Sequence, residues 1–468
     1  MSKRQLGIIA AVALGLLTPK LAQAQEWLKD RQANQGAGIQ AGDNLELHPS
    51  IGAEVGYDSN YFLRSTKDGP NIINAAPTNP VEGTGMLRVT PALSISTVRP
   101  LVGGSDVTQE PPKVTFTGGL SATYREFLFN SDLTSQRNIS AQADAAAQIL
   151  PGRPVGLILN GGFSRVIQPT VLGDPNLSFN RDDVTAAAAL VLQPGSGTLD
   201  WRFGYQFLGS YFEDQTGATL NNVTHEVLTK GRWKWRPRTA LIYDATMRFI
   251  NYADATNVTG LRNSTPVRAR LGLTGLVSSN LSLLALAGYG ASFFDTTGSA
   301  TVQQYDSVIG QVEAKYYLTA PPGGDPAAMS LTLSSVAIGY LRDFENSYLG
   351  DFYGTDKVYA KISWFFAGRV QLSLTGSVST IEYPTLFNLD NSVNHAAFTD
   401  VRADTTLFGE YRLTSNFGIN ATVGYAQNFS STQLTTPPPA GAPPGTPPTV
   451  YDMSWQRVQA FLGVRWFM

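Results

Sequence analysis

The chain has 468 residues, a formal net charge of −2 and no cysteine, and only 15% of its residues are charged, whereas about a quarter is usual in soluble domains. The lack of a basic surplus argues against a nucleic-acid partner, and the lack of cysteine excludes a disulfide framework. A mean hydropathy close to zero is what a lipid-facing band averaged with a wet interior gives.

Residues 1–24 have the pattern of an export signal. Lys3 and Arg4 precede an apolar stretch at 6–17, and the small-residue sequence AQA follows at 22–24. The apolar stretch is shorter than the roughly 18 residues that a membrane-spanning helix needs, and no later segment reaches that length. We therefore expect residues 1–24 to be a signal peptide that is removed on export.

Residues 25–44 show no clear strand pattern. We interpret them as a flexible periplasmic N-terminal arm. A short helix around 27–32 and a plug inside the lumen are the alternatives, although twenty residues are too few for a folded plug domain.

From residue 45 to the end, apolar and polar side chains alternate in segments separated by turns. A period of two is typical of a strand with one apolar and one polar face, and about nine to eleven residues let a tilted strand cross a bilayer. The segments predict an all-β fold, a transmembrane antiparallel up-and-down β-barrel of about 18 strands over residues 45–468. The predicted strands are 45–57, 85–98, 113–127, 136–149, 154–166, 180–193, 198–212, 222–236, 239–252, 264–278, 280–294, 304–318, 330–344, 355–367, 369–382, 399–413, 416–429 and 452–467. In 330–344 the alternation changes face between Leu333 and Val336, which predicts a β-bulge.

The connections alternate between short and long. Tight turns rich in Pro, Gly and Ser fall at 150–153, 194–197, 237–238, 279, 368 and 414–415. An even strand number with short periplasmic turns and longer outer loops is the usual arrangement in bacterial barrels. Two predicted periplasmic connections, 99–112 and 319–329, are long exceptions. The Pro-rich outer loop 430–451 is expected to be extended, either shielding the pore mouth or merely solvated.

The alternation also assigns each charged residue to a face. A base on the lipid face at the midplane costs about 2–4 kcal/mol, so the bases should face the lumen. The predicted pore-lining bases are Arg88, Arg125, Arg181, Arg202, Lys230, Arg232, Lys234, Arg248, Arg268, Arg270, Lys315, Lys357, Lys361, Arg402, Arg412 and Arg457, and Lys113, Arg236, Arg369 and Arg465 share their register. The predicted lumen acids are fewer: Glu46, Glu54, Asp144, Asp183, Asp200, Glu226, Asp244, Glu313, Asp343, Asp400, Asp404 and Glu410. Charged or titratable exceptions on the lipid face fall near outer strand ends: Glu126, Arg137, Arg165, Asp182, His225, Asp306, Arg342, Asp356, Glu382 and Asp452.

The excess of lumen bases predicts a wall that attracts anions. The densest patch runs along 230–236, with Arg248, Arg268 and Arg270 on the next two strands. For any single base, an ion-pair partner on the inner wall is the alternative reading. Barrels of sixteen to eighteen strands leave an aqueous channel, so we expect a wide pore in contact with outer-membrane lipids.

Catalysis is not expected. Of the three histidines, His225 faces lipid, His48 lies near the periplasmic end of its strand, and His395 lies in a loop. No Ser/His/Asp set can be placed on one wall. The sequence has neither a metal-ligand cluster nor a glycine-rich phosphate loop between a strand and a helix, so no metal or cofactor is expected.

The stretch LHPSIGAEVGYDSNYF at 47–62, with GYDSN at its centre, resembles the first strand of one porin family. These are outer-membrane β-barrel porins found with bacterial polysaccharide export systems. The resemblance implies a passive conduit that carries a polysaccharide to the cell surface with a periplasmic polysaccharide export protein as partner. From chemistry alone, Asp58 and Asn60 suit a strand-to-loop transition by hydrogen-bonding nearby backbone.

Two rivals remain beside polysaccharide export. One is a general or anion-leaning diffusion porin for small solutes, and the other is a structural or adhesive surface barrel. Long loops folded into the bore would favour the diffusion porin. An open bore with a docking surface at 99–112 and 319–329 would favour export.

Overall fold

The computed structural model describes residues 38–42, 44–69, 71–97, 112–129, 133, 136–167, 179–195, 197–214, 220–253, 262–295, 301–318, 334–366, 369–387, 391–436, 443, 445 and 447–468. The predicted signal peptide and most of the predicted N-terminal arm lie outside the described residues, as do nearly all of 99–112 and all of 319–329. Within the described residues, no helix is long and apolar enough to cross a membrane.

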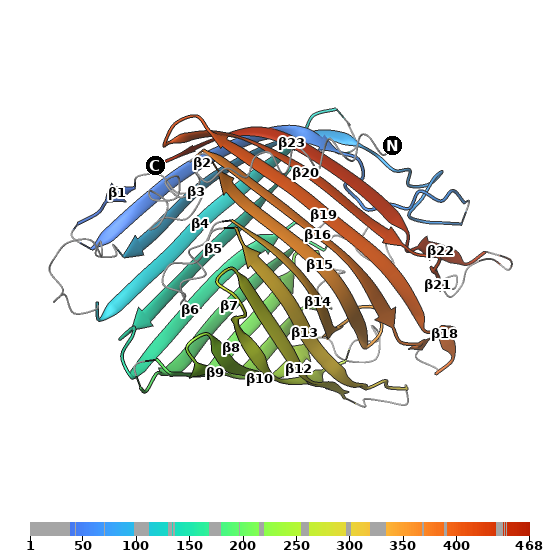
Figure 1. Ribbon diagram of the computed structural model, residues 1–468. Coiled ribbons are helices and arrows are strands. Elements are labelled where there is room, and N and C mark those ends of the chain that lie inside the picture. Colours follow the sequence, from blue (N-terminus) through green and yellow to red (C-terminus); the bar gives the residue numbers. More distant parts are fainter. Residues whose placement is uncertain are drawn as a thin grey trace, which may run out of the picture.

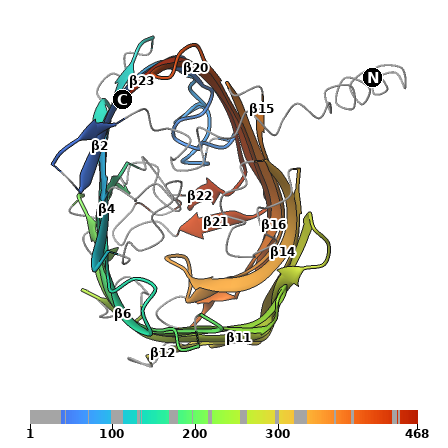
Figure 2. The same ribbon diagram turned by 60° about the vertical axis from the view of Figure 1, so that its left-hand side comes forward.

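Eighteen strands form one closed antiparallel sheet, each paired with the next along the chain and the last with the first (Figures 1 and 2). Their bounds are β2 (Leu45–Asp58), β3 (Thr84–Thr97), β4 (Val114–Phe127), β5 (Asn138–Ile149), β6 (Val155–Val166), β7 (Arg181–Leu192), β8 (Leu199–Phe212), β9 (Asn222–Arg236), β10 (Thr239–Tyr252), β11 (Ser264–Leu276), β12 (Leu281–Phe294), β13 (Tyr305–Tyr317), β14 (Ser335–Asn346), β15 (Phe352–Phe366), β16 (Val370–Tyr383), β19 (Phe398–Arg412), β20 (Phe417–Phe429) and β23 (Trp455–Phe467). The predicted barrel is confirmed in strand number and order.

Two strands begin three or more residues later than predicted. The strand placed at 330–344 is β14, which starts at Ser335 and pairs with β15 without a register shift. The predicted bulge therefore does not lie within β14, and Leu333 is outside the described residues. The strand placed at 452–467 begins at Trp455, because Asp452 belongs to a separate hairpin.

The side chains of each strand alternate between two environments, as the period of two predicts. Along β23, Val458, Leu462 and Val464 are exposed on the outer face, whereas Phe461 and Phe467 are buried on the inner face. The closed sheet pairs the backbone polar groups that hydrocarbon could not satisfy. A closed barrel with an apolar outer face is typical of bacterial outer-membrane proteins. The protein is therefore located in the bacterial outer membrane.

The two ends of the barrel differ. At one end, here called the turn end, short turns join the strands. Pro237 and Arg238 alone connect β9 to β10, and Gly195 and Gly197 adopt positive φ of 66° and 79° between β7 and β8. The chain terminus also lies there, where the Met468 backbone N–H donates to the Pro49 carbonyl at 3.0 Å. The two-residue strand β1 (Ile39–Gln40) pairs with the start of β2 at this end.

The opposite end, here called the loop end, carries the long connections and two extra hairpins. These pair β17 (Leu386–Phe387) with β18 (Val393–His395), and β21 (Gln433–Thr436) with β22 (Thr449–Asp452). The hairpin of β21 and β22 lies at the loop end in Figure 1 and within the outline of the ring in Figure 2, so it covers the mouth. The Pro-rich stretch between β21 and β22, for which an extended conformation was predicted, lies mostly outside the described part of the chain, including residues 437–442.

Candidate pore lining and outer mouth

Most predicted pore-lining arginines are ion-paired with carboxylates. Within 4.0 Å lie the pairs Arg88–Glu54, Arg181–Asp183, Arg202–Asp200, Arg232–Asp200, Arg248–Glu226, Arg268–Asp343, Arg270–Asp244, Arg402–Asp404, Arg412–Glu410 and Arg457–Asp58. The predicted alternative of an inner-wall ion-pair ladder therefore holds for these residues. Among described residues, no carboxylate lies within that distance of six other predicted bases, Arg125, Lys230, Lys234, Lys315, Lys357 and Lys361.

The predicted basic patch divides into two parts. Lys230 and Lys234 on β9 have no ion-pair partner among the described residues. On β11, Arg268 is 5% exposed and its Nε lies 2.9 Å from Asp343. Arg270 pairs with Asp244 at 2.8 Å. The arginines on β10 and β11 are therefore neutralised, partly by Asp343 and Glu345 on β14.

The hairpin of β14 and β15 bends inward beyond Arg342, where its pairing with β13 stops. Phe344 lies an even number of residues after Ile338, which faces outward, so the strand alternation would place it on the outer face. Its side chain is instead only 1% exposed and stacks on Tyr305, with ring centroids 4.1 Å apart. The bend carries Asp343 and Glu345 to Arg268. The sequence signal for this bend is an aromatic residue near the end of the strand, at a position where the alternation predicts an outward-facing side chain.

Charged residues predicted on the lipid face mostly find partners near the loop end. Arg342 pairs with Asp356 at 2.6 Å, Arg165 with Glu213, and the His225 ring nitrogen lies 2.6 Å from the Tyr205 hydroxyl. The placement of Asp452 on the lipid face is wrong. Its side chain is fully buried, because the chain turns away from the barrel wall before β23 begins.

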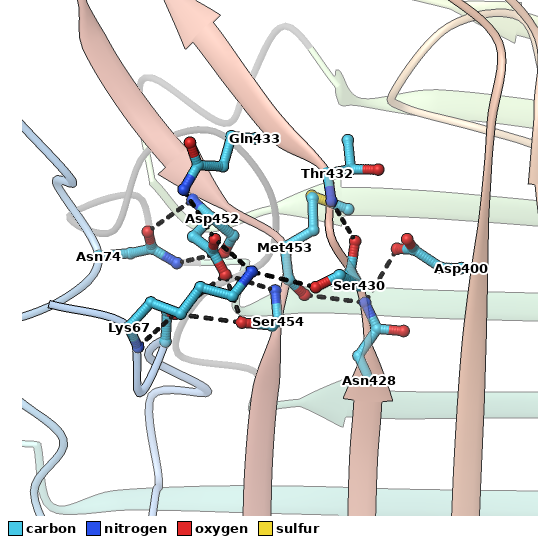
Figure 3. Close-up of polar contacts among 11 residues, drawn as sticks. Lys67, Asn74, Asp400, Asn428, Ser430, Thr432, Gln433, Asp452, Met453 and Ser454 are labelled. Carbon is cyan, nitrogen blue, oxygen red and sulfur yellow. Dashed lines mark hydrogen bonds and ion pairs between the residues drawn. The ribbon is translucent and has the colours of Figure 1, made fainter. Parts of the chain in front are cut away.

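Asp452 is the centre of a polar cluster that holds two loops together (Figure 3). Its carboxylate accepts hydrogen bonds from Lys67 Nζ at 2.9 Å, Ser65 Oγ at 3.0 Å and Gln433 Nε2 at 3.2 Å. Asn74 exchanges two hydrogen bonds with the Asp452 backbone, at 2.8 and 3.0 Å. Burial alone would raise the pKa of Asp452, but the hydrogen bonds from Ser454 and Lys67 outweigh it and hold that pKa below its usual value.

We use the name lid for the described residues of three segments at the loop end, 59–83, 384–397 and 430–454. An apolar core joins them, formed by Leu386, Leu434, Tyr451 and Met453. Asn428 Nδ2 ties the lid to the wall by donating to Asp400 at 2.9 Å and to the Met453 carbonyl at 2.8 Å (Figure 3). The mouth therefore carries a folded cover rather than separate loops.

The stretch that carries the porin resemblance lies at the root of the lid. Asp58 is fully buried and accepts the backbone N–H of Asn60 at 3.1 Å, as predicted, and also binds Arg457 Nε at 3.0 Å. Asn60 donates to the carbonyls of Arg64 and Gln456 at 2.8 and 3.0 Å. The local role in the strand-to-loop transition is confirmed, while the ion pair across the first and last strands was not foreseen.

A cavity of about 490 Å³ lies beneath the lid. It reaches from Val166, where β6 ends, to Tyr383 at the end of β16, so it extends across the inside of the barrel. Four arginines line it, Arg88, Arg125, Arg402 and Arg457, together with aromatic side chains. Within the described part of the chain, no three His, Cys, Asp or Glu side chains are placed to hold a metal ion.

No protein-family model matches this sequence, and no similar curated protein was found. Among solved structures, the outer membrane protein opdK from Pseudomonas aeruginosa is similar with a TM-score of 0.44 and 11% identity, over 90% of this chain and 99% of that chain. A BenF-like porin from Pseudomonas fluorescens has a TM-score of 0.44 and 10% identity, over 91% and 99%. The FrpB iron transporter from Neisseria meningitidis has a TM-score of 0.42 and 9% identity, over 95% and 83%.

Proposed function

We propose that this protein is a passive channel, not an enzyme, and that its loop end faces the cell exterior. The observation that carries the proposal is the cavity that reaches from β6 to β16 beneath the lid, with charged and polar residues in its lining. A barrel of eighteen strands is wide enough to contain an aqueous path. The predicted pore-lining bases would then form its wall.

The folded lid favours a diffusion channel for small polar solutes. Loops held together by the ion pair of Lys67 with Asp452 and by an apolar core restrict the width of what can pass the mouth. Lys230, Lys357 and Lys361 have no carboxylate partner among described residues, which gives the wall a positive bias. We infer a preference for anions over cations of similar size.

Polysaccharide export is the second candidate, and the GYDSN stretch at 56–60 is the observation that favours it. In that case the lid would open, or a single polymer strand would thread past it. A periplasmic polysaccharide export protein would dock at the turn end, where 99–112 and 319–329 are predicted to lie.

Two measurements test the function. Purified protein in a planar bilayer should give stable ion currents. In a salt gradient, their reversal potential should show that anions permeate better than cations. Deletion of the gene should reduce uptake of small anions and leave surface polysaccharide unchanged if the channel is a diffusion porin. Loss of surface polysaccharide with normal uptake would instead establish export, and the absence of any current would refute the channel.

A further inference from the structure

Two arginines face each other on adjacent strands beneath the lid. Arg88 on β3 and Arg125 on β4 are direct register partners, and both line the cavity. Like charges directly opposite each other destabilise a sheet. Such a pair persists in a folded wall when the contacts of each guanidinium offset the repulsion.

Arg125 is held in place by neutral groups. Its Nη1 donates to Asn138 Oδ1 at 3.2 Å and to Ser140 Oγ at 3.0 Å. Asn138 in turn donates to the Tyr61 hydroxyl at 3.2 Å. These contacts orient the guanidinium without cancelling its charge, and they leave Nε and Nη2 without a described partner. That edge is the one that binds a carboxylate through two parallel hydrogen bonds.

Arg88 is only weakly compensated. Its Nε lies 3.5 Å from Glu54, and its guanidinium carbon lies 3.3 Å from the centre of the Phe461 ring, which fixes its position. Arg88 Nε is buried and makes no hydrogen bond with a described residue. Of the other two arginines that line the cavity, Arg457 is neutralised by fully buried Asp58, and Arg402 pairs with Asp404 at 2.9 Å. The surplus positive charge of this wall therefore belongs to Arg88 and Arg125.

The opposite side of the cavity has different chemistry. Asp400 is 1% exposed, and one of its carboxylate oxygens binds Asn428 while the other makes no hydrogen bond with a described residue. A carboxylate oxygen without a partner can accept a hydrogen bond from a hydroxyl group, and the charge of the carboxylate repels a second negative charge. Tyr383 and Trp455 also line the cavity and offer apolar ring faces.

We propose that Arg88 and Arg125 form a carboxylate-binding subsite for an acidic sugar. The two arginines would hold the single carboxylate, Asp400 would accept hydrogen bonds from sugar hydroxyls, and the aromatic rings would cover the apolar face of the sugar. A dianion such as phosphate fits less well because Asp400 stands in the same cavity. This inference deepens the proposed channel function and rests on it for the route by which the sugar arrives.

The test is calorimetric titration of the full-length barrel in detergent at low ionic strength. Glucuronate should bind, and glucose and inorganic phosphate should bind at least tenfold more weakly. Arg125→Gln should weaken glucuronate binding at least tenfold, and Arg125→Lys should give an intermediate loss because an ammonium cannot bind in the bidentate way. Arg238→Gln, in the turn between β9 and β10, is the matched control and should change binding less than twofold.

The outcomes separate the subsite from the channel. Unchanged glucuronate binding in Arg125→Gln, or phosphate binding as tight as glucuronate, would overturn the subsite whatever the ion currents show. Should Arg125→Gln fail to fold, Arg88→Gln carries the same expectation. Binding without any current would refute the channel and keep the subsite. An oligouronate that binds more tightly than the monomer identifies a polymer as the source of the sugar, and equal affinity identifies a free sugar acid.

Discussion

The Nζ atom of Lys67 lies 2.9 Å from Oδ2 of Asp452, so an ion pair joins two loops whose residues are 385 positions apart in the sequence. Asp452 is fully buried, while the Lys67 side chain is 42% exposed. Because the two loops flank the closure of β2 on β23, the pair fastens the lid at the one place where neighbouring strands are not consecutive in the chain.

Lys67→Ala should loosen the lid. Leaving the buried Asp452 carboxylate without one of its donors costs about 1–3 kcal/mol, and the exposure of Lys67 places the loss at the low end. We expect faster proteolysis within 430–454 and more frequent opening events in single-channel records. Asp68→Asn, in the same loop and without a described ion-pair partner, is the control. Identical records for the two variants would show that the ion pair does not hold the lid.

The lid should resist mild acid. The pKa of Asp452 is held below its usual value of 3.8 in the folded lid, so the ionised carboxylate contributes stability that is fully present above that value. This stability is lost as the pH falls through the lowered pKa. Channel gating and protease resistance should therefore be constant from neutral pH to about pH 4 and change only below it. A transition between pH 5 and 7 would contradict this assignment.

A disulfide should lock the lid. The hydroxyl oxygens of Ser65 and Ser454 are 3.3 Å apart, and the chain has no cysteine that could mispair. In Ser65→Cys/Ser454→Cys, oxidation should suppress opening events, and a reducing agent should restore them. Each single variant should respond to neither treatment. Normal opening in the oxidised double variant would show that the lid does not gate the channel.

Phe344→Ala should free the inward hairpin of β14 and β15. The ring is buried against Tyr305 and Ile309, and removing such a ring costs about 3–5 kcal/mol. We expect faster hydrogen exchange at 343–355 and a larger conductance, since Asp343 and Glu345 would leave the wall. Ile338→Ala, at a lipid-facing site on the same strand, should leave both measurements unchanged.

The strands could be predicted because a membrane requires apolar side chains on the outer face of each strand, so apolar and polar residues alternate regularly. A base on the lipid face is costly, so Arg125 or Arg457 placed in the wrong register would be penalised at once. The same constraint assigns the neighbouring residues Arg457 and Val458 to opposite faces of β23, so a period of two identifies each face.

The lid and the cavity could not be predicted in this way. Asp452 was assigned to the wall as an exception on the lipid face near an outer strand end, yet its partners Lys67 and Asn74 come from the other end of the chain. Phe344 follows the outward parity until the strand loses its neighbour β13. Both depend on contacts between distant segments, on which the local alternation of side chains carries no information.

The closure of the barrel between its first and last strands allows the connectivity of the chain to be changed. At the loop end, Asp58 and Asn60 on one side bind Arg457 and Gln456 on the other, much as a hairpin turn would join two strands. At the turn end, Met468 lies against the start of β2. A short linker from Met468 to residue 44, with new termini opened at the tight turn 237–238, would give a circular permutant that lacks β1 but in which each of the eighteen barrel strands keeps both neighbours. The order in which the strands are synthesised would change, and the finished barrel would be the same.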